Sequence, residues 1–202
     1  MRGIQIRFFM AGKFFLLVVK DILINPAKTW DLIDSENRSV SVINYHFLFP
    51  LILLVSVSAF AGSLIYINPE LSFVYSVLAG IKCFILFYIT VYGTSFILKE
   101  ITFPLELGRN FTVSFRLVSY SMAPLLLCQV LSRFFESMQF VNVLALFGLY
   151  IFWTGAERIL TPAASKKIPL LVAGFITFVG IFFASNFLLT KLINKIYYAF
   201  FS

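Results

Sequence analysis

Residues 115–131 read FRLVSYSMAPLLLCQVL, and this stretch decides the fold. After Arg116 it carries no charge, and Pro124 lies inside its apolar run. A proline removes one backbone donor and bends a helix, which a bilayer tolerates only where neighbouring groups cover the freed carbonyl. Hydroxyl groups lie just before the proline, in Ser119–Ser121, and we expect them to cover the freed carbonyl. The stretch therefore predicts a bent central helix around which other membrane helices pack.

The composition of the whole chain is typical of an integral membrane protein. Of its 202 residues, 60% are hydrophobic and only 12% are charged, whereas soluble domains are about half apolar and about a quarter charged. The net charge of +7 in such a protein first indicates orientation and contact with anionic lipid, so we expect no nucleic-acid partner. The expected fold is an all-α integral membrane protein with five transmembrane helices and an N-terminal interfacial amphipathic helix.

The membrane domain is expected at residues 46–195, because it contains five apolar runs and about 20 residues cross a bilayer. The predicted spans are about 47–67, 73–98, 117–135, 139–156 and 168–190. We expect Asn44 to cap the first span and Pro50 to lie in its opening turn. The Asn-Pro-Glu sequence at 68–70 predicts a tight turn, and residues 196–202 form a C-terminal tail.

Pairs of small residues one helical turn apart predict close helix contacts. Ser58 and Gly62 form such a pair in the first span, and Gly180 and Ala184 form another in the fifth. These pairs fit packing within the bundle, with a homodimer face as the alternative.

Residues 1–45 are expected to form a cytoplasmic region with interfacial helices. Lysines interrupt the apolar run within residues 1–24, which is too short to span a bilayer and fits a helix lying in the interface. Asn25 followed by Pro26 predicts the start of a second short helix, with Asn25 as its cap. That helix would turn Trp30 and Ile33 inward or into the membrane surface.

The distribution of lysine and arginine predicts the orientation. Alternate sides of the membrane carry six, three and three of these residues against none, one and two, with Lys82 left inside the second span. The positive-inside rule then puts the N-terminus in the cytoplasm and the C-terminus outside. Because the region before the first span is short, we also expect the membrane to be the inner membrane of a bacterium.

Two motifs and one shorter sequence carry a resemblance to a known family. Residues 25–30 read NPAKTW ahead of the first span, and Phe49, Pro50 and Leu51 open that span. Residues 116–124 in the third span read RLVSYSMAP, with Arg116, Tyr120 and Pro124 among them, and this motif is the most distinctive. The chain resembles the Yip family of multispan membrane proteins, in the form of its short bacterial members. The resemblance implies a five-helix membrane domain and, in eukaryotic members, roles in vesicle traffic, membrane shaping and contact with small GTPases. Because the Asp-Leu-Tyr-Gly-Pro type motif of those members is absent here, we do not expect GTPase binding.

The residues that support chemistry are few, and we expect no enzyme, cofactor or metal. The chain has one histidine, His46, and all its aspartates precede the first span, so intramembrane zinc, aspartyl and serine–histidine catalysis are disfavoured. The cysteines, Cys83 and Cys128, lie in apolar runs and are expected to act as small hydrophobic residues.

Lys82 is the polar residue that most favours a specific function. It lies nine residues after Phe73, which predicts a position near the middle of the bilayer, where a charge is costly. We expect it to extend toward the outer surface or to contact Tyr75, Gln129 and Asn142 at similar depth.

A second candidate surface is a basic rim on the cytoplasmic side that would attract anionic lipid. Its members are Arg109, Arg116, Arg158, Lys166 and Lys167. We also expect local ion pairs within Lys99-Glu100 and within Glu157-Arg158.

Two functions fit this sequence. The first is a non-enzymatic adaptor or organiser of the membrane with an undefined protein partner. The alternative is a small transporter, channel or lipid-handling protein that uses Lys82 and the bend at Pro124. A solid bundle would favour the adaptor, and a polar cavity joining Lys82 to Gln129 and Asn142 would favour the alternative.

Overall fold

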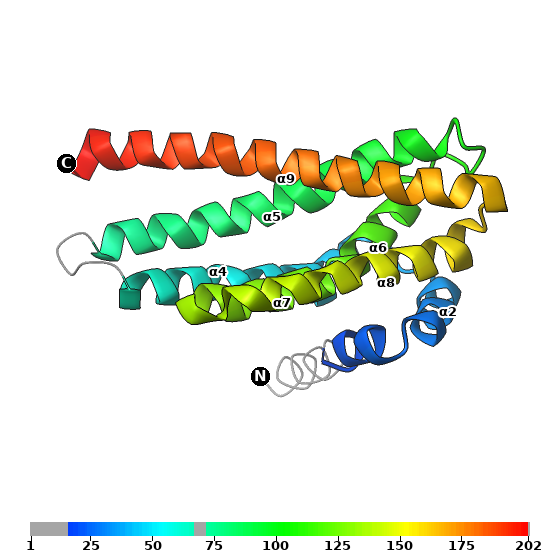
Figure 1. Cartoon of the computed structure of the whole chain (residues 1–202), viewed down its shortest axis with the longest axis horizontal. Helices are drawn as coiled ribbons and strands as arrows, with labels where there is room; N and C mark the ends of the chain where they lie inside the picture. Colours follow the sequence, from blue (N-terminus) through cyan, green and yellow to red (C-terminus); the bar gives the residue numbers. More distant parts are fainter. Residues whose placement is uncertain (1–15, 67–71, 202) are drawn as a thin grey trace, which may run out of the picture.

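The computed structural model describes residues 16–66 and 72–201, and helices dominate this part of the chain, with none of its residues in a strand (Figure 1). After a helical segment at residues 16–24, the elements are α2 (Pro26–Glu36), α3 (Val40–Ile43), the π-helical turn η1 (Asn44–Leu48), α4 (Phe49–Tyr66), α5 (Ser72–Thr102), α6 (Phe111–Ser121), α7 (Ala123–Phe134), the 3-10 helix η2 (Glu136–Leu146), α8 (Phe147–Gly155), the π-helical turn η3 (Ala156–Leu160) and α9 (Ala164–Phe201).

Four of these helical stretches are long and apolar enough to cross a membrane, and the bent pair α6–α7 makes a fifth if it is counted as one span. The four are Val40–Tyr66, Phe73–Thr102, Ser137–Leu160 and Ala164–Ala199. The predicted all-α membrane fold is confirmed. The helices are longer than the predicted spans, because hydrogen bonding continues past the last apolar residue into charged turns such as that of Lys99 and Glu100.

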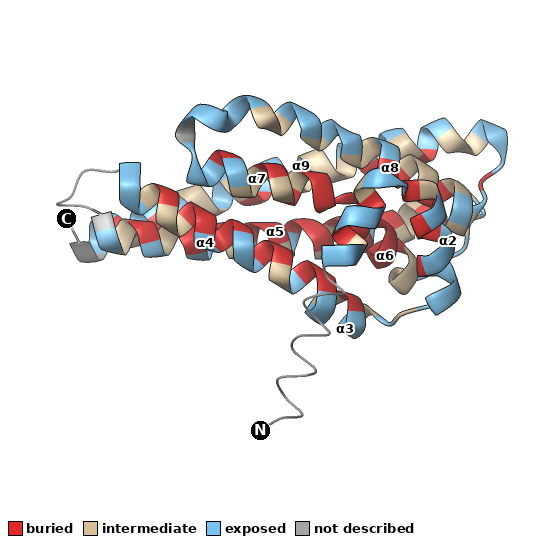
Figure 2. Cartoon of the chain, turned by 90° about the horizontal axis from the view of Figure 1, so that it is seen from below, coloured by how far each residue is buried: buried red, intermediate tan, exposed pale blue. Residues whose placement is uncertain are grey.

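The predicted central helix is the most buried element of the described chain. Every residue from 114 to 124 is buried, and the axes of α6 and α7 meet at 41°. Pro124 lies in the first turn of α7, where its missing N–H group is tolerated, so the helix breaks just before it. In Figure 2 most of α6 has the colour of buried residues. By contrast, only 11% of the most apolar window of α9 is buried, against 44% for the helix containing α4.

The helices pack in a definite order around this centre. α4 lies between α5 and α7, α9 lies along the outer side of α5, and α8 packs on α6 and α2 (Figure 1). We call the end of the bundle that carries α2 the α2 end. The opposite end, where α4 and α5 are connected and α7 finishes, is the far end.

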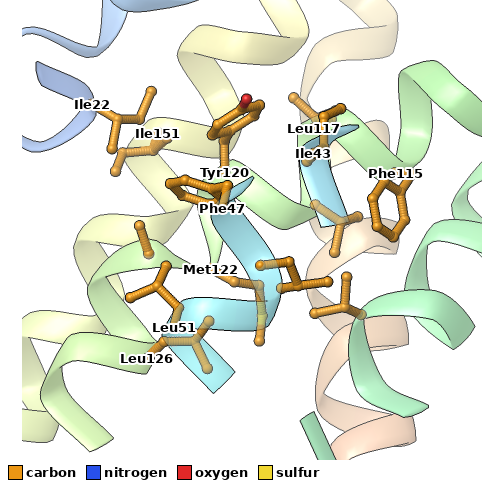
Figure 3. Packing of buried hydrophobic residues seen from close by; sticks show 14 of the residues in the cluster. Ile22, Ile43, Phe47, Leu51, Phe115, Leu117, Tyr120, Met122, Leu126 and Ile151 are labelled. Carbon is orange, nitrogen blue, oxygen red and sulfur yellow. The ribbon is translucent and has the colours of Figure 1, made fainter. Parts of the chain in front are cut away.

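Part of the buried apolar core lies at the α2 end. The ring of Tyr120 lies 4.4 Å from that of Phe47, with Ile22 and Ile151 beside them (Figure 3). Ile22 is fully buried, so the segment 16–24 docks on the bundle by one face. Its other face exposes apolar side chains, as an interfacial helix would; they are Leu16, Leu17 and Ile24.

Two expectations about the first span were wrong. Asn44 does not cap the helix, which begins at Val40 and runs through η1 without a break. Pro50 therefore lies well inside the helix rather than in its opening turn. The π-helical turn just before it shifts the hydrogen-bond pattern by one residue, which accommodates a residue without an N–H group. Residues 1–15 and the predicted turn at 68–70 lie outside the described residues.

The two pairs of small residues behave differently. Ser58 and Gly62 are buried, and a methyl group added at Gly62 would lie 1.9 Å from the Arg133 carbonyl oxygen, so this pair marks the contact of α4 with α7. Gly180 and Ala184 are exposed, and no atom lies within 4 Å of a methyl group added at Gly180. The pair in α9 therefore makes no close contact inside the described bundle.

Candidate functional site

The two sequence motifs meet at the α2 end. Asn25 caps α2 by accepting a hydrogen bond from the backbone N–H of Lys28 at 3.3 Å, and Pro26 opens the helix, as predicted. Trp30 is fully buried, and its indole Nε1 donates to the carbonyl oxygen of Ile151 at 2.9 Å. Its ring also meets Tyr120 edge-on at 5.8 Å. The two motifs therefore contact each other directly, through Trp30 and Tyr120.

Arg116 completes this contact from the central helix. Its side chain is buried, with one terminal nitrogen 2.7 Å from Asn37 Oδ1 and 3.2 Å from the carbonyl oxygen of Arg38. The other terminal nitrogen lies 3.5 Å from Asp34 Oδ1. Arg116 was predicted as part of the lipid-binding rim, and that prediction was wrong, because its guanidinium is covered by the turn after α2 and holds that turn in place.

The remaining cations of the rim are at the surface, but each contacts a carboxylate. Arg109 pairs with Glu100 at 2.6 Å, Arg158 with Asp31 at 2.8 Å, Lys167 with Glu157 at 2.7 Å, and Lys166 with Glu106. The Lys166 ammonium holds the pKa of the Glu106 carboxyl below its usual value by hydrogen bonding. The expected Lys99–Glu100 pair is present at 3.1 Å. Glu157 and Arg158 do not pair locally, because each reaches a residue distant in sequence.

Lys82 lies in a cleft at the far end. The cleft has a volume of about 280 Å³ and is bounded by α4, α5, the end of α7 and α9, and we call it the cationic cleft. Its polar lining residues are Ser63, Tyr66, Tyr75, Lys82, Ser132, Arg133, Gln139, Thr190 and Asn194. Among these described residues none is acidic, and neither Lys82 nor Arg133 forms an ion pair in the described part of the chain.

Gln129 and Asn142 stand directly behind the cleft wall. Gln129 Nε2 donates to Asn142 Oδ1 at 3.1 Å, and Arg133 Nε donates to Gln129 Oε1 at the same distance. The hydroxyl of Ser132 also donates to Asn142 Oδ1, at 3.3 Å. All four residues predicted for the polar site therefore lie in or directly behind one cleft. Arg133, in the last turn of α7, was missed, although it is the one lysine or arginine between Arg116 and Arg158.

The length of α5 changes the interpretation of the depth of Lys82. Counted from Lys99 at the α2 end, Lys82 is 17 residues along the helix, or about 25 Å at roughly 1.5 Å per residue. The hydrocarbon core is about 30 Å thick. This count favours a position for Lys82 near the far edge of the hydrocarbon core rather than at its centre. Water and lipid headgroups have access to that edge.

The helices and the cleft define a multi-pass α-helical membrane protein with a cationic site at one end. No protein-family model, curated protein or solved structure matches this chain.

Proposed function

We propose that this chain is a non-enzymatic membrane protein that handles lipid, and that the cationic cleft binds an anionic headgroup. The observation that carries this proposal is the contrast between the two ends. The rim cations at the α2 end already hold carboxylates, whereas Lys82 and Arg133 share a cleft without an acidic residue among its described lining. A partly desolvated cation is costly without a counter-charge, so the cleft favours an anion.

The chemistry of the lining suits a phosphate group. Arginine presents a planar fork of donors and lysine a compact charge, and both bind phosphate oxygens through charge-assisted hydrogen bonds. Hydroxyl and amide groups such as those of Tyr75 and Gln139 add further polar contacts. With the N-terminus in the cytoplasm and the C-terminus outside, the cleft would face the outer leaflet of a bacterial inner membrane.

Membership of the Yip family is part of this proposal. Its support is that NPAKTW and RLVSYSMAP, which carry the resemblance, contact each other through Trp30, Tyr120 and the turn that Arg116 holds. A role as a membrane organiser with a protein partner is the second candidate. The exposed apolar face of residues 16–24 favours it, because such a face inserts into a membrane surface.

The double variant Lys82→Gln/Arg133→Gln tests the lipid proposal. We expect its affinity for phosphatidylglycerol to fall by at least about tenfold, because each hydrogen bond to a charged group contributes about 1.5–3 kcal/mol. The measurement is native mass spectrometry of the purified protein titrated with phosphatidylglycerol and, separately, with phosphatidylcholine. Titration with inorganic phosphate separates a lipid headgroup from a free anion.

Lys191→Gln/Lys195→Gln is the matched control. It also removes two positive charges near the far end of the bundle, but from exposed positions on α9. It should leave the affinity for phosphatidylglycerol within about twofold. Equal losses in both double variants would mean that net charge, not the cleft, attracts the lipid. An unchanged affinity in the cleft variant would reject the proposal and favour the organiser.

A further inference from the structure

A second cavity lies at the bend of the central helix, and its chemistry is opposite to that of the cationic cleft. It has a volume of about 190 Å³ and an almost wholly apolar lining, and we call it the bend chamber. Its walls come from α5, the α6–α7 bend, η2, α8 and α9. The described lining residues are Thr94, Val118, Ser121, Met122, Leu125, Ala145, Leu146, Gly148, Leu149, Phe152, Phe175 and Phe178.

Two hydroxyl groups in this chamber lack partners. The side-chain oxygens of Thr94 and Ser121 are buried and form no hydrogen bond to any residue that the structure describes. Other helical hydroxyls, such as those of Thr90 and Ser95, donate to the carbonyl one turn earlier, at 2.7 and 2.6 Å. A buried polar group without a partner is costly. Ser121 was expected to cover the carbonyl freed by Pro124, and the structure shows that it does not.

The chamber is accessible from the side of the bundle that faces lipid. Leu146 in η2 and Phe175 in α9 line the chamber and are 59% and 40% exposed. A molecule entering between them comes from the bilayer rather than from water.

The position of α2 indicates how deep in the bilayer the hydroxyls of Thr94 and Ser121 lie. This helix carries charged side chains, so we expect it to lie outside the hydrocarbon, and its Trp30 contacts Tyr120, one residue before Ser121. Thr94 lies five residues inward from Lys99, or about 7.5 Å along α5 at roughly 1.5 Å per residue. Both hydroxyls are thus just inside the membrane boundary at the α2 end, where the esters of a lipid meet its acyl chains.

We propose that the bend chamber binds a diacyl lipid from the leaflet at the α2 end. The first methylenes of one acyl chain fill the chamber, and its ester carbonyl oxygen accepts hydrogen bonds from Thr94 and Ser121. This site is separate from the cationic cleft and selects for an ester, not for a charge.

The test compares two phosphatidylcholines that carry the same photoactivatable group in one chain, one with ester-linked and one with ether-linked chains. We expect residues of the chamber in the wild-type protein to be labelled about fivefold more by the diester. In Thr94→Val/Ser121→Ala, which nearly preserves shape, that ratio should fall to about one. Labelling is mapped by mass spectrometry of proteolytic fragments.

Two controls make the outcome specific. Ala145→Phe fills the chamber and should reduce its labelling by at least about fivefold, whereas Ile176→Phe on the exposed face of α9 should not. The diester preference should persist in Lys82→Gln/Arg133→Gln, so this proposal and the proposed function fail separately. An unchanged ester preference in Thr94→Val/Ser121→Ala, or a chamber left unlabelled while the outer face of α9 is labelled, would overturn the inference.

Discussion

Replacing Trp30 by alanine will lower the free energy of unfolding by about 3–5 kcal/mol, the usual cost of deleting a large buried aromatic side chain. Trp30 is fully buried, donates to the Ile151 carbonyl and meets Tyr120 edge-on. Its ring also occupies the space beside Gly155, where an added methyl group would lie 2.5 Å from the indole. The void left by alanine cannot close easily, because these walls belong to the central helix and α8.

The expected loss is measured by unfolding the detergent-solubilised protein with heat or sodium dodecyl sulfate. Leu32→Ala is the matched control, because Leu32 lies on the same helix and is 55% exposed. It should change the free energy of unfolding by less than about 0.5 kcal/mol. If Trp30→Ala and Leu32→Ala behaved alike, α2 would not be docked as described.

Replacing Gly62 by leucine will have the second large effect, a loss of at least about 3 kcal/mol, at the upper end of the cost of overpacking. The atom that the new side chain meets is the backbone carbonyl oxygen of Arg133, which cannot rotate away. α4 and α7 must then separate, and Arg133 moves out of the cationic cleft. The unfolding free energy and the phosphatidylglycerol affinity should therefore fall together.

Gly180→Leu provides the comparison for this change. The same side chain is added in another helix, at a position with no atom within 4 Å of an added methyl group. We expect no loss of stability there, because leucine favours a helix more than glycine does. Comparable losses at both positions would show that glycine is required in these helices for a reason other than close packing.

Sequence patterns were sufficient for the elements whose causes are local. Pro124 bends the central helix because the missing donor acts within one turn, and Asn25 and Pro26 begin α2 for reasons confined to four residues. The long uncharged run around Pro124 also indicated a buried centre, since a bent apolar helix in lipid needs neighbours.

Contacts between residues distant in sequence could not be predicted from those patterns. Arg116 directly precedes the predicted third span, as an interfacial cation would, and only the return of the chain after α2 brings Asp34 and Asn37 over it. The ion pairs of the rim likewise join residues from separate elements, so a count of positive charges overestimated the charge available to lipid. For Pro50, the π-helical turn that accommodates it has no sequence signature that we recognised.

Only some residues of the cationic cleft were predicted, because the others depend on contacts between separate helices. Lys82, Gln129 and Asn142 were recognised because polar residues in apolar spans are rare and costly. Arg133 was counted only for the orientation of the chain, and its place beside Lys82 depends on the contact of α4 with α7 at Gly62. The bend chamber was not predicted, because the Ser121 hydroxyl was expected to cover the carbonyl freed by Pro124 and Thr94 carried no prediction.

The central claim is that the chain crosses the membrane five times around the bent α6–α7 helix, with the two ends of the bundle on opposite sides. Single cysteines placed in a background lacking Cys83 and Cys128, one at Ser35 in α2 and one at Tyr198, are both at exposed positions and can be tested with a membrane-impermeant maleimide in intact cells and in inverted vesicles. The account predicts labelling of position 198 only in intact cells and of position 35 only in inverted vesicles. Labelling of both positions from the same side would contradict it.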